Sequence, residues 1–208
     1  MSENFPFNYF STLSHSLRDL EICDIESAKI NSSEGFDRLC ELSTDIALRD
    51  AQQFMVGNGA SAAMANHMCL DWTKNAKVRT RSFANAPLLT AMGNDLGFEH
   101  AMSEPLSWYA HPGDLLVTIS SSGSSPNIIN AIKMARKLKM TVITLSGLNP
   151  ENPSRSLGDL NIYVSAKTYG MVECAHQVIM HCWLDQYMQI KEWETSSPQN
   201  MRETRSDA

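Results

Sequence analysis

The chain has 208 residues, 43% of them hydrophobic, which fits one folded domain and excludes disorder as a description of the whole chain. Its formal net charge of −6 argues against a broad nucleic-acid-binding surface, because such surfaces need clustered Lys and Arg. The five cysteines are odd in number and form no C-x-x-C pair, so we expect a reducing cytoplasm, and neither a signal peptide nor a membrane span is predicted.

The first 52 residues predict two helices in succession. Apolar residues recur at roughly helical spacing over residues 7–25 and again over 35–52, and Ser32 or Ser33 is a suitable cap for the second helix. We expect this N-terminal helical pair, residues 1–52, to form part of the same unit as the rest of the chain. The polar tail at residues 193–208 is expected to be disordered.

From residue 53 to residue 192 short apolar segments alternate with amphipathic ones. Strands are predicted at 53–56, 78–83, 115–120, 140–145 and 160–164. Helices are predicted from residue 60 onward and at 86–92, 98–110, 127–138 and 171–192. Strands and helices in this alternation predict an α/β domain with a central parallel sheet covered by helices.

A serine-rich loop follows the strand at 115–120. The following helix begins near Ser125, its predicted N-cap, with Pro126 at the first helical position. Backbone N–H groups and hydroxyls of the loop therefore face the positive end of a helix dipole, at the strand end where α/β sheets bind ligands. The loop has no Lys and does not fit a nucleotide P-loop, so it predicts a site for a small phosphorylated metabolite. The alternative is a flexible surface loop that is merely rich in serine.

Two histidines and two carboxylates form a second candidate site. His67 and Asp71 are four residues apart, which places them on one helix face, and Glu173 and His181 are close enough on the last helix to border one cavity. Such a set can hold a divalent metal such as zinc, or supply an acid and a base for proton transfer. A simple surface His–Asp pair and a structural core histidine are the alternatives.

Three motifs resemble those of the sugar isomerase (SIS) domain, and most closely those of the phosphoheptose isomerase group. They are GNGASAA at residues 57–63, GNDLGF at 93–98 and ISSSGSS at 119–125. The resemblance covers essentially residues 5–192. It implies a flavodoxin-like, three-layer SIS domain at 53–192 and a homotetramer with active sites at the subunit interfaces.

The resemblance also implies roles for individual residues. The residues that would bind the sugar phosphate are Asn58, Ser61, Asp95, Ser120, Ser121, Ser122, Ser125 and Glu173. The residues that would hold a divalent metal, zinc in some members, are His67, Asp71, Glu173 and His181. Asp71 and His181 would be the acid–base pair.

The chain departs from the family pattern at three places. Asp71 stands where Glu is usual and is one methylene shorter, and Glu173 replaces a neutral Gln. Gly170 and Met171 stand where Asp or Thr and then Arg are usual. These departures leave open whether the catalytic geometry and the substrate contacts of the family are kept.

The implied activity is a ketose–aldose isomerisation. Sedoheptulose 7-phosphate and D-glycero-D-manno-heptose 7-phosphate would interconvert through an enediol, supplying heptose for lipopolysaccharide or capsule. One alternative is a non-catalytic, phosphosugar-binding or regulatory SIS protein of the DnaA initiator-associating type. The polar candidates at all four histidine and carboxylate positions favour an enzyme over that alternative. An isomerase of a different sugar phosphate is the other.

Overall fold

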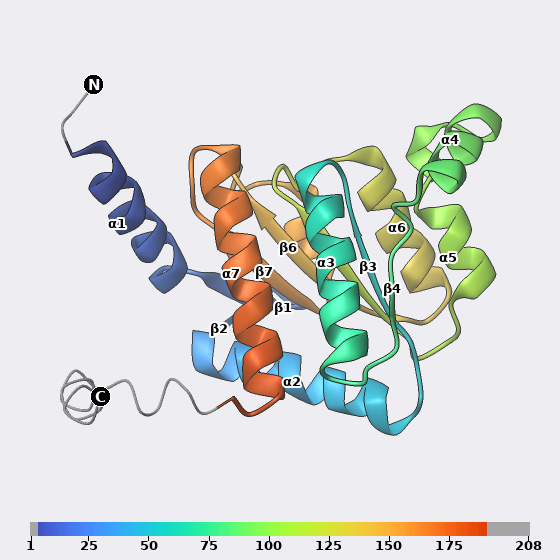
Figure 1. Ribbon diagram of the computed structural model, residues 1–208, viewed down its shortest axis with the longest axis horizontal. Coiled ribbons are helices and arrows are strands. Elements are labelled where there is room, and N and C mark those ends of the chain that lie inside the picture. Colours follow the sequence, from blue (N-terminus) through green and yellow to red (C-terminus); the bar gives the residue numbers. More distant parts are fainter. Residues whose placement is uncertain (1–3, 191–208) are drawn as a thin grey trace, which may run out of the picture.

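A mixed β-sheet forms the centre of the computed structural model, which describes residues 4–190 (Figure 1). Its strands are β1 (Glu21–Asp24), β2 (Lys29–Ile30), β3 (Gln53–Gly57), β4 (Thr80–Arg81), β5 (Leu115–Ser120), β6 (Thr141–Gly147) and β7 (Leu160–Val164). They lie in the order β2-β1-β7-β6-β5-β3-β4. The strands β4, β3, β5, β6 and β7 are parallel, whereas β1 pairs antiparallel with both β7 and β2. The predicted α/β class is confirmed, with a sheet that is parallel except at one edge.

Helices cover both faces of this sheet. The α-helices are α1 (Phe5–Arg18), α2 (Ser32–Leu48), α3 (Ala60–Lys74), α4 (Ala86–Asp95), α5 (Ser103–Tyr109), α6 (Pro126–Lys137) and α7 (Tyr169–Tyr187). Two 3₁₀ turns are η1 (Phe98–His100) and η2 (Pro153–Ser156). In Figure 1, α3 and α7 stand side by side in front of the sheet, and α1 contacts α7 while projecting from the rest of the fold. None of the described helices has both the length and the apolarity that crossing a membrane requires.

Two hydrophobic cores, one on each face of the sheet, give the fold its three layers. Along β5, Leu115, Val117 and Ile119 pack with residues of α2, α3 and α7, whereas Leu116 packs with residues of α5 and α6. This alternation follows from the period of two residues in a strand. Because both faces are covered, every residue of β3, β5 and β7 is buried.

The predicted helix at 7–25 is wrong beyond Arg18. Glu21–Asp24 instead forms β1, which continues into β2 and adds an antiparallel hairpin between the two helices of the predicted N-terminal pair. Ile22 is almost fully buried opposite Ile162 of β7, and Glu21 accepts a 2.7 Å hydrogen bond from Arg155. These contacts are distant in the sequence, and pairing with the edge of the sheet outweighs the local helical pattern.

Other helix and strand boundaries also differ from the predicted ones. The predicted strand at 78–83 is reduced to Thr80–Arg81, and the predicted helix at 98–110 is divided into η1 and α5. The helix predicted at 86–92 continues to Asp95, so Gly93, Asn94 and Asp95 are helical. The last helix begins at Tyr169 and ends at Tyr187. The predicted tail at 193–208 lies outside the described residues.

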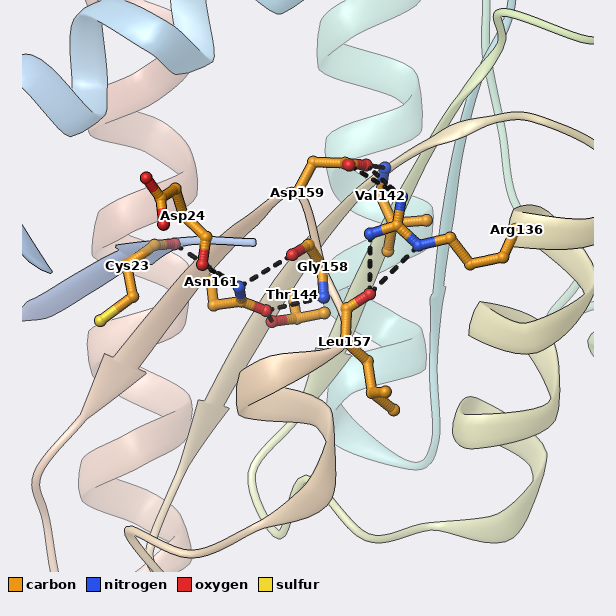
Figure 2. Close-up of polar contacts among 9 residues, drawn as sticks. All are labelled: Cys23, Asp24, Arg136, Val142, Thr144, Leu157, Gly158, Asp159 and Asn161. Carbon is orange, nitrogen blue, oxygen red and sulfur yellow. Dashed lines mark hydrogen bonds and ion pairs between the residues drawn. The ribbon is translucent and has the colours of Figure 1, made fainter. Parts of the chain in front are cut away.

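A polar network joins the amino ends of β6 and β7 to their neighbours (Figure 2). The amide of Asn161 accepts hydrogen bonds from Thr144 Oγ1 and Gly158 N, both at 2.8 Å, and donates to the carbonyl of Gly158 at 2.9 Å. Asp159 accepts from Val142 N and from the guanidinium of Arg136, a residue of α6. The network fixes the start of both strands and therefore the position of their carboxyl ends, where the serine-rich loop lies.

Candidate active site

A cavity of about 110 Å³ opens at the carboxyl end of the sheet, beside the first turns of α3, α6 and α7. The residues that line it are Asn58, Ser61, Ile119, Ser120, Ser121, Ser122, Ser125, Tyr169 and Glu173. The fold therefore brings together seven of the eight residues predicted to bind the sugar phosphate. The eighth, Asp95, is an exposed residue at the end of α4 that accepts a hydrogen bond from Asn94 and does not line this cavity.

The hydroxyls of the serine-rich loop differ in what they contact. Ser120 Oγ accepts a hydrogen bond from Gly123 N at 3.2 Å and so stabilises the loop itself. Ser121 Oγ is buried and has no hydrogen-bond partner among the described residues. Ser125 is the N-cap residue of α6 and Pro126 is its first residue, as predicted, yet the Ser125 hydroxyl caps no N–H group of the helix. Two hydroxyls at the positive end of α6 are thus available to an anion.

The loop is held in place from the side of β6. Gly123 has a φ of +60°, and a Cβ there would collide with the amide of Asn152. Ser154 N donates to the carbonyl of Gly123 at 3.0 Å, and Gly147 N donates to the carbonyl of Ser121 at 3.1 Å. Glycine is therefore required at position 123, both for its backbone conformation and for the close approach of Asn152.

A second group of side chains lies between α3 and α7. His67 Nε2 and Asp71 Oδ2 are 3.1 Å apart, and the ring centroids of His67 and His181 are 5.2 Å apart. His67, Asp71 and His181 each offer a ligand atom, and these atoms all lie within 4.8 Å of one another. The side chain of His67 is 49% exposed and that of Asp71 is 21% exposed, so the group is open to solvent.

Glu173 does not belong to this three-residue group, although the sequence associates it with the same metal site. Its side chain lines the serine-loop cavity. Glu173 lies in the first turns of α7, and His181 lies eight residues further along, a rise of about 12 Å in an α-helix. The eight-residue spacing thus puts the two residues at different levels of the same helix.

The donor set of the three-residue group suits a zinc ion. Two imidazole nitrogens and one carboxylate oxygen form a ligand set that zinc enzymes use, with a fourth position open to water or substrate. A 3.1 Å separation of His67 Nε2 and Asp71 Oδ2 is compatible with a hydrogen bond or with shared ligation of one ion. The same geometry also fits a histidine and a carboxylate acting as proton-transfer groups.

Two residues at or beside the cavity were not predicted from the sequence. Tyr169 lines the cavity from the first position of α7, where the prediction had begun the helix two residues later. Asn127, in the first turn of α6, hydrogen-bonds the side chain of Asn58. A helix predicted to start at residue 169 would have placed Tyr169 at the cavity. The contact of Asn127 with Asn58 could not be predicted from the local sequence, because the two residues are 69 positions apart.

His176, on the same helix as His181, has a different environment. It is fully buried, and its Nε2 lies 3.2 Å from the carbonyl oxygen of Ser146. Burial lowers the pKa of His176 to about 4, with the Ser146 hydrogen bond opposing that shift. The imidazole is therefore neutral at neutral pH, which fits a structural role.

Comparisons with known proteins agree with this fold. A family model described as SIS domain matches residues 24–147. A phosphoheptose isomerase of Campylobacter concisus is 32% identical over 161 residues, covering 74% of this chain and 85% of that protein. A phosphoheptose isomerase of Aromatoleum aromaticum is 32% identical over 153 residues, covering 70% of this chain and 77% of that protein.

Phosphoheptose isomerases are also found among the similar solved structures. A phosphoheptose isomerase from Neisseria gonorrhoeae superposes with a TM-score of 0.76 at 26% identity, covering 90% of this chain and 99% of that one. A phosphoheptose isomerase from Francisella tularensis has a TM-score of 0.77 at 21% identity, covering 91% and 99%, and at that identity it supports the fold alone.

The mostly parallel sheet, with helices on both faces and a serine-rich loop at its carboxyl end, defines a three-layer α/β protein. The chain belongs to the SIS domain family and, within it, to the phosphoheptose isomerase group.

Proposed function

We propose that this chain is an aldose–ketose isomerase that interconverts sedoheptulose 7-phosphate and D-glycero-D-manno-heptose 7-phosphate. The observation that carries the proposal is the buried hydroxyl of Ser121, which has no partner among the described residues and belongs to a cavity at the N-terminus of α6. A phosphate oxygen at this position would supply the missing partner. The naming of the curated relatives supports the heptose phosphate as the substrate.

The phosphate would be held by serines and by helix dipoles rather than by basic side chains. Among the described residues that line the cavity none is Lys or Arg, whereas five are serines. We assign Ser121, Ser122 and Ser125 to the phosphate, and Asn58 and Ser61 face the same sugar phosphate from the other side of the cavity. The carboxylate of Glu173 would accept hydrogen bonds from sugar hydroxyls, because its charge disfavours direct contact with the phosphate.

Proton transfer would take place at the other end of the sugar. If the phosphate binds in the serine-loop cavity, C1 and C2 are the carbons of the seven-carbon chain that lie furthest from it. The group of His67, Asp71 and His181 lies further along α3 and α7, away from that cavity. We propose that Asp71 and His181 move the proton between C1 and C2. Asp71 would also orient His67, with which it already shares a 3.1 Å contact.

The proposal includes a divalent metal, with zinc as the first candidate, held by His67, Asp71 and His181. When bound, the ion would polarise the carbonyl oxygen and stabilise negative charge on the enediol. Zinc should raise the melting temperature of the wild-type protein, because an ion that binds only the folded state stabilises it by about 2.7 kcal/mol at 100 times Kd. The variant His67→Ala should lose most of this shift in a thermal melt, and an equal shift in both proteins would contradict the metal site.

We also propose a homotetramer with active sites at the subunit interfaces. An open cavity of about 580 Å³ runs along α7 and is lined in part by His181, Val178 and Ile190. Helix α1 exposes Phe5, Phe7 and Phe10, each more than 60% accessible. Large exposed apolar surface of this kind marks an interface, and one that includes His181 would border the active site. Sedimentation of the wild-type protein and of Phe10→Glu tests this, since the variant should shift to smaller species.

The five cysteines lie among the described residues without forming a disulfide, which supports the proposed cytoplasmic location. The product would then be available for lipopolysaccharide or capsule heptose.

The deciding experiment incubates the purified protein with sedoheptulose 7-phosphate, with and without zinc, and follows formation of the aldose. Turnover is expected, and Asp71→Glu should preserve or raise it because the longer carboxylate is the one usual in the family. Absence of turnover under both conditions, with phosphosugar binding intact, would favour a regulatory SIS protein instead.

An isomerase of a different sugar phosphate is the second candidate. It is favoured by Gly170 and Met171 at the first turn of α7, because this edge of the cavity lacks the arginine usual in the family. A panel of five-, six- and seven-carbon ketose phosphates distinguishes the two candidates by their kcat/KM values.

A further inference from the structure

Asn127 forms a side-chain link that the proposed phosphate and catalytic residues do not include. It lies in the first turn of α6 and is only 2% exposed. Its Oδ1 accepts hydrogen bonds from Ile128 N at 3.0 Å and from Asn58 Nδ2 at 2.9 Å. Its Nδ2 donates to Asn58 Oδ1 at 2.8 Å. The two amides therefore exchange a pair of hydrogen bonds, and the bond from Ile128 N fixes which way the Asn127 amide faces.

The link connects the two halves of the serine-loop cavity. Asn58 belongs to the turn between β3 and α3, which is flanked by Gly57 and by Gly59 with its φ of +54°. Ser61 follows on α3, and Ser121 and Ser125 lie on the other side, at the start of α6. Glycines give a turn this shape but no side chains that pack against a neighbour. The amide pair therefore joins the turn to α6, beyond the pairing of β3 with β5.

We propose that Asn127 is a positioning residue that holds the N-termini of α3 and α6 at a fixed separation, so that Ser61 and the serine-rich loop face the same phosphosugar. It acts through Asn58 and makes no contact with substrate itself. This inference rests on the proposed function, because it assumes that the cavity receives the phosphate of the substrate. Fixing both halves before the ligand arrives removes an ordering cost from binding.

Aspartate cannot replace Asn127 in this role. A carboxylate at position 127 still accepts from Ile128 N and suits the N-terminus of a helix, but it has no N–H to donate to Asn58 Oδ1. The variant Asn127→Asp should therefore keep the hydrogen bond from Ile128 N and lose the one to Asn58 Oδ1, and its added negative charge would itself weaken phosphate binding. If Asn127 had only a structural role, its substitution would lower the stability of the protein and leave the ligand affinity of the folded fraction unchanged.

The test compares Asn127→Ala, Asn127→Asp, Asn58→Ala and the double alanine variant, with Asn130→Ala as the matched control. Asn130 lies one turn further along α6, is directed to the carbonyl of Glu99 and does not line the cavity. Each variant is measured by calorimetric titration with inorganic phosphate, by kcat and KM for sedoheptulose 7-phosphate, and by thermal unfolding.

Asn127→Ala should bind inorganic phosphate about tenfold more weakly and raise KM more than it lowers kcat, because the turn that leads to Ser61 must then be ordered as the ligand binds. The double alanine variant should be no weaker than Asn127→Ala, since the two side chains act as one unit, and Asn130→Ala should match the wild type. Phosphate affinity of Asn127→Ala within about twofold of the wild type, or effects that add in the double variant, would overturn the link. A wild type that binds phosphate but turns over no heptose phosphate would instead overturn the proposed activity.

Discussion

The polar network at the amino ends of β6 and β7 and the serine-rich cavity at the carboxyl end of the sheet differ in how their buried groups are paired. In the network at the start of β6 and β7, the amide of Asn161 and the carboxylate of Asp159 have all their hydrogen-bonding atoms engaged (Figure 2). At the carboxyl end, the buried hydroxyl of Ser121 has no partner among residues 4–190. An unsatisfied buried group costs about 1–3 kcal/mol, and a ligand that reaches it recovers that cost. The buried side chain of Gln53 at the start of β3 also lacks a partner in the described part of the chain, but it does not line the cavity. The contrast distinguishes the network that stabilises the fold from the cavity that we propose binds the phosphate.

Charge is arranged differently at the two ends as well. The amino-end network contains an ion pair between Arg136 and Asp159, with a nitrogen–oxygen distance of 2.8 Å. The described residues that line the carboxyl-end cavity include one ionisable carboxylate, Glu173, and no basic side chain. An anion bound there must rely on N–H groups, hydroxyls and helix dipoles, which is compatible with the net charge of −6.

The largest expected effect is the loss of turnover in His181→Ala. Removing a proton-transfer group should lower kcat about 10²- to 10⁴-fold, whereas the melting temperature should change little because the side chain is partly exposed. Gln186→Ala on the same helix, a residue bonded to Asp37, is the control and should retain turnover. Equal kcat values for His181→Ala and the control would remove His181 from the chemistry.

At the opposite end of the sheet, Asn161→Ala should mainly affect stability. The substitution leaves Thr144 Oγ1, Gly158 N and the Gly158 carbonyl without their partner, so the free energy of unfolding should fall by about 2–4 kcal/mol. Urea denaturation measures this loss, and kcat of the folded fraction should match the wild type. A loss of kcat without a loss of stability would show that the two ends are not separate in function.

The pH dependence of stability should report on His176. The pKa of His176 is lowered from 6.5 to about 4 in the folded state. Between these two pH values the unfolded chain binds a proton at His176, whereas the folded chain does not. The stability contributed by neutral His176 is complete above pH 6.5 and should be lost towards pH 4, by up to about 3 kcal/mol. His176→Gln, which keeps a donor for the Ser146 carbonyl, should have a flatter profile in urea unfolding between pH 7 and pH 4.5. Parallel profiles for the two proteins would contradict the shift.

The smallest effect is expected for Ser121→Ala. Loss of one hydroxyl–phosphate hydrogen bond should weaken phosphate binding about fivefold, while stability should stay equal or rise because an unsatisfied buried hydroxyl is removed. Ser124→Ala, an exposed serine of the same loop that does not line the cavity, is the control. Titration with inorganic phosphate and thermal unfolding give both quantities. A destabilised Ser121→Ala with unchanged affinity would make this end of the sheet resemble the other.

The sequence predicted the elements whose signals are local. The apolar runs of β5 and β7 identified buried strands correctly, and Ser125 with Pro126 identified the start of α6. The hairpin of β1 and β2 was missed because Ile22 and Cys23 become a strand only by pairing with β7, about 140 residues away. The link between Asn127 and Asn58 was missed for the same reason, since neither residue shows its partner locally.

The sequence alone determined the α/β class, the serine-rich loop at a strand end, and the spacing that puts His67 and Asp71 on one helix face. Those features depend on periodicity, capping and contacts within one helical turn, all of which are local. Only the tertiary structure decided that His181 joins His67 and Asp71 while Glu173 faces the serines and Asp95 lies elsewhere. The physical reason is that the packing of α7 against α3, and the ends of α4 and β5, are set by contacts between distant segments that no local pattern encodes.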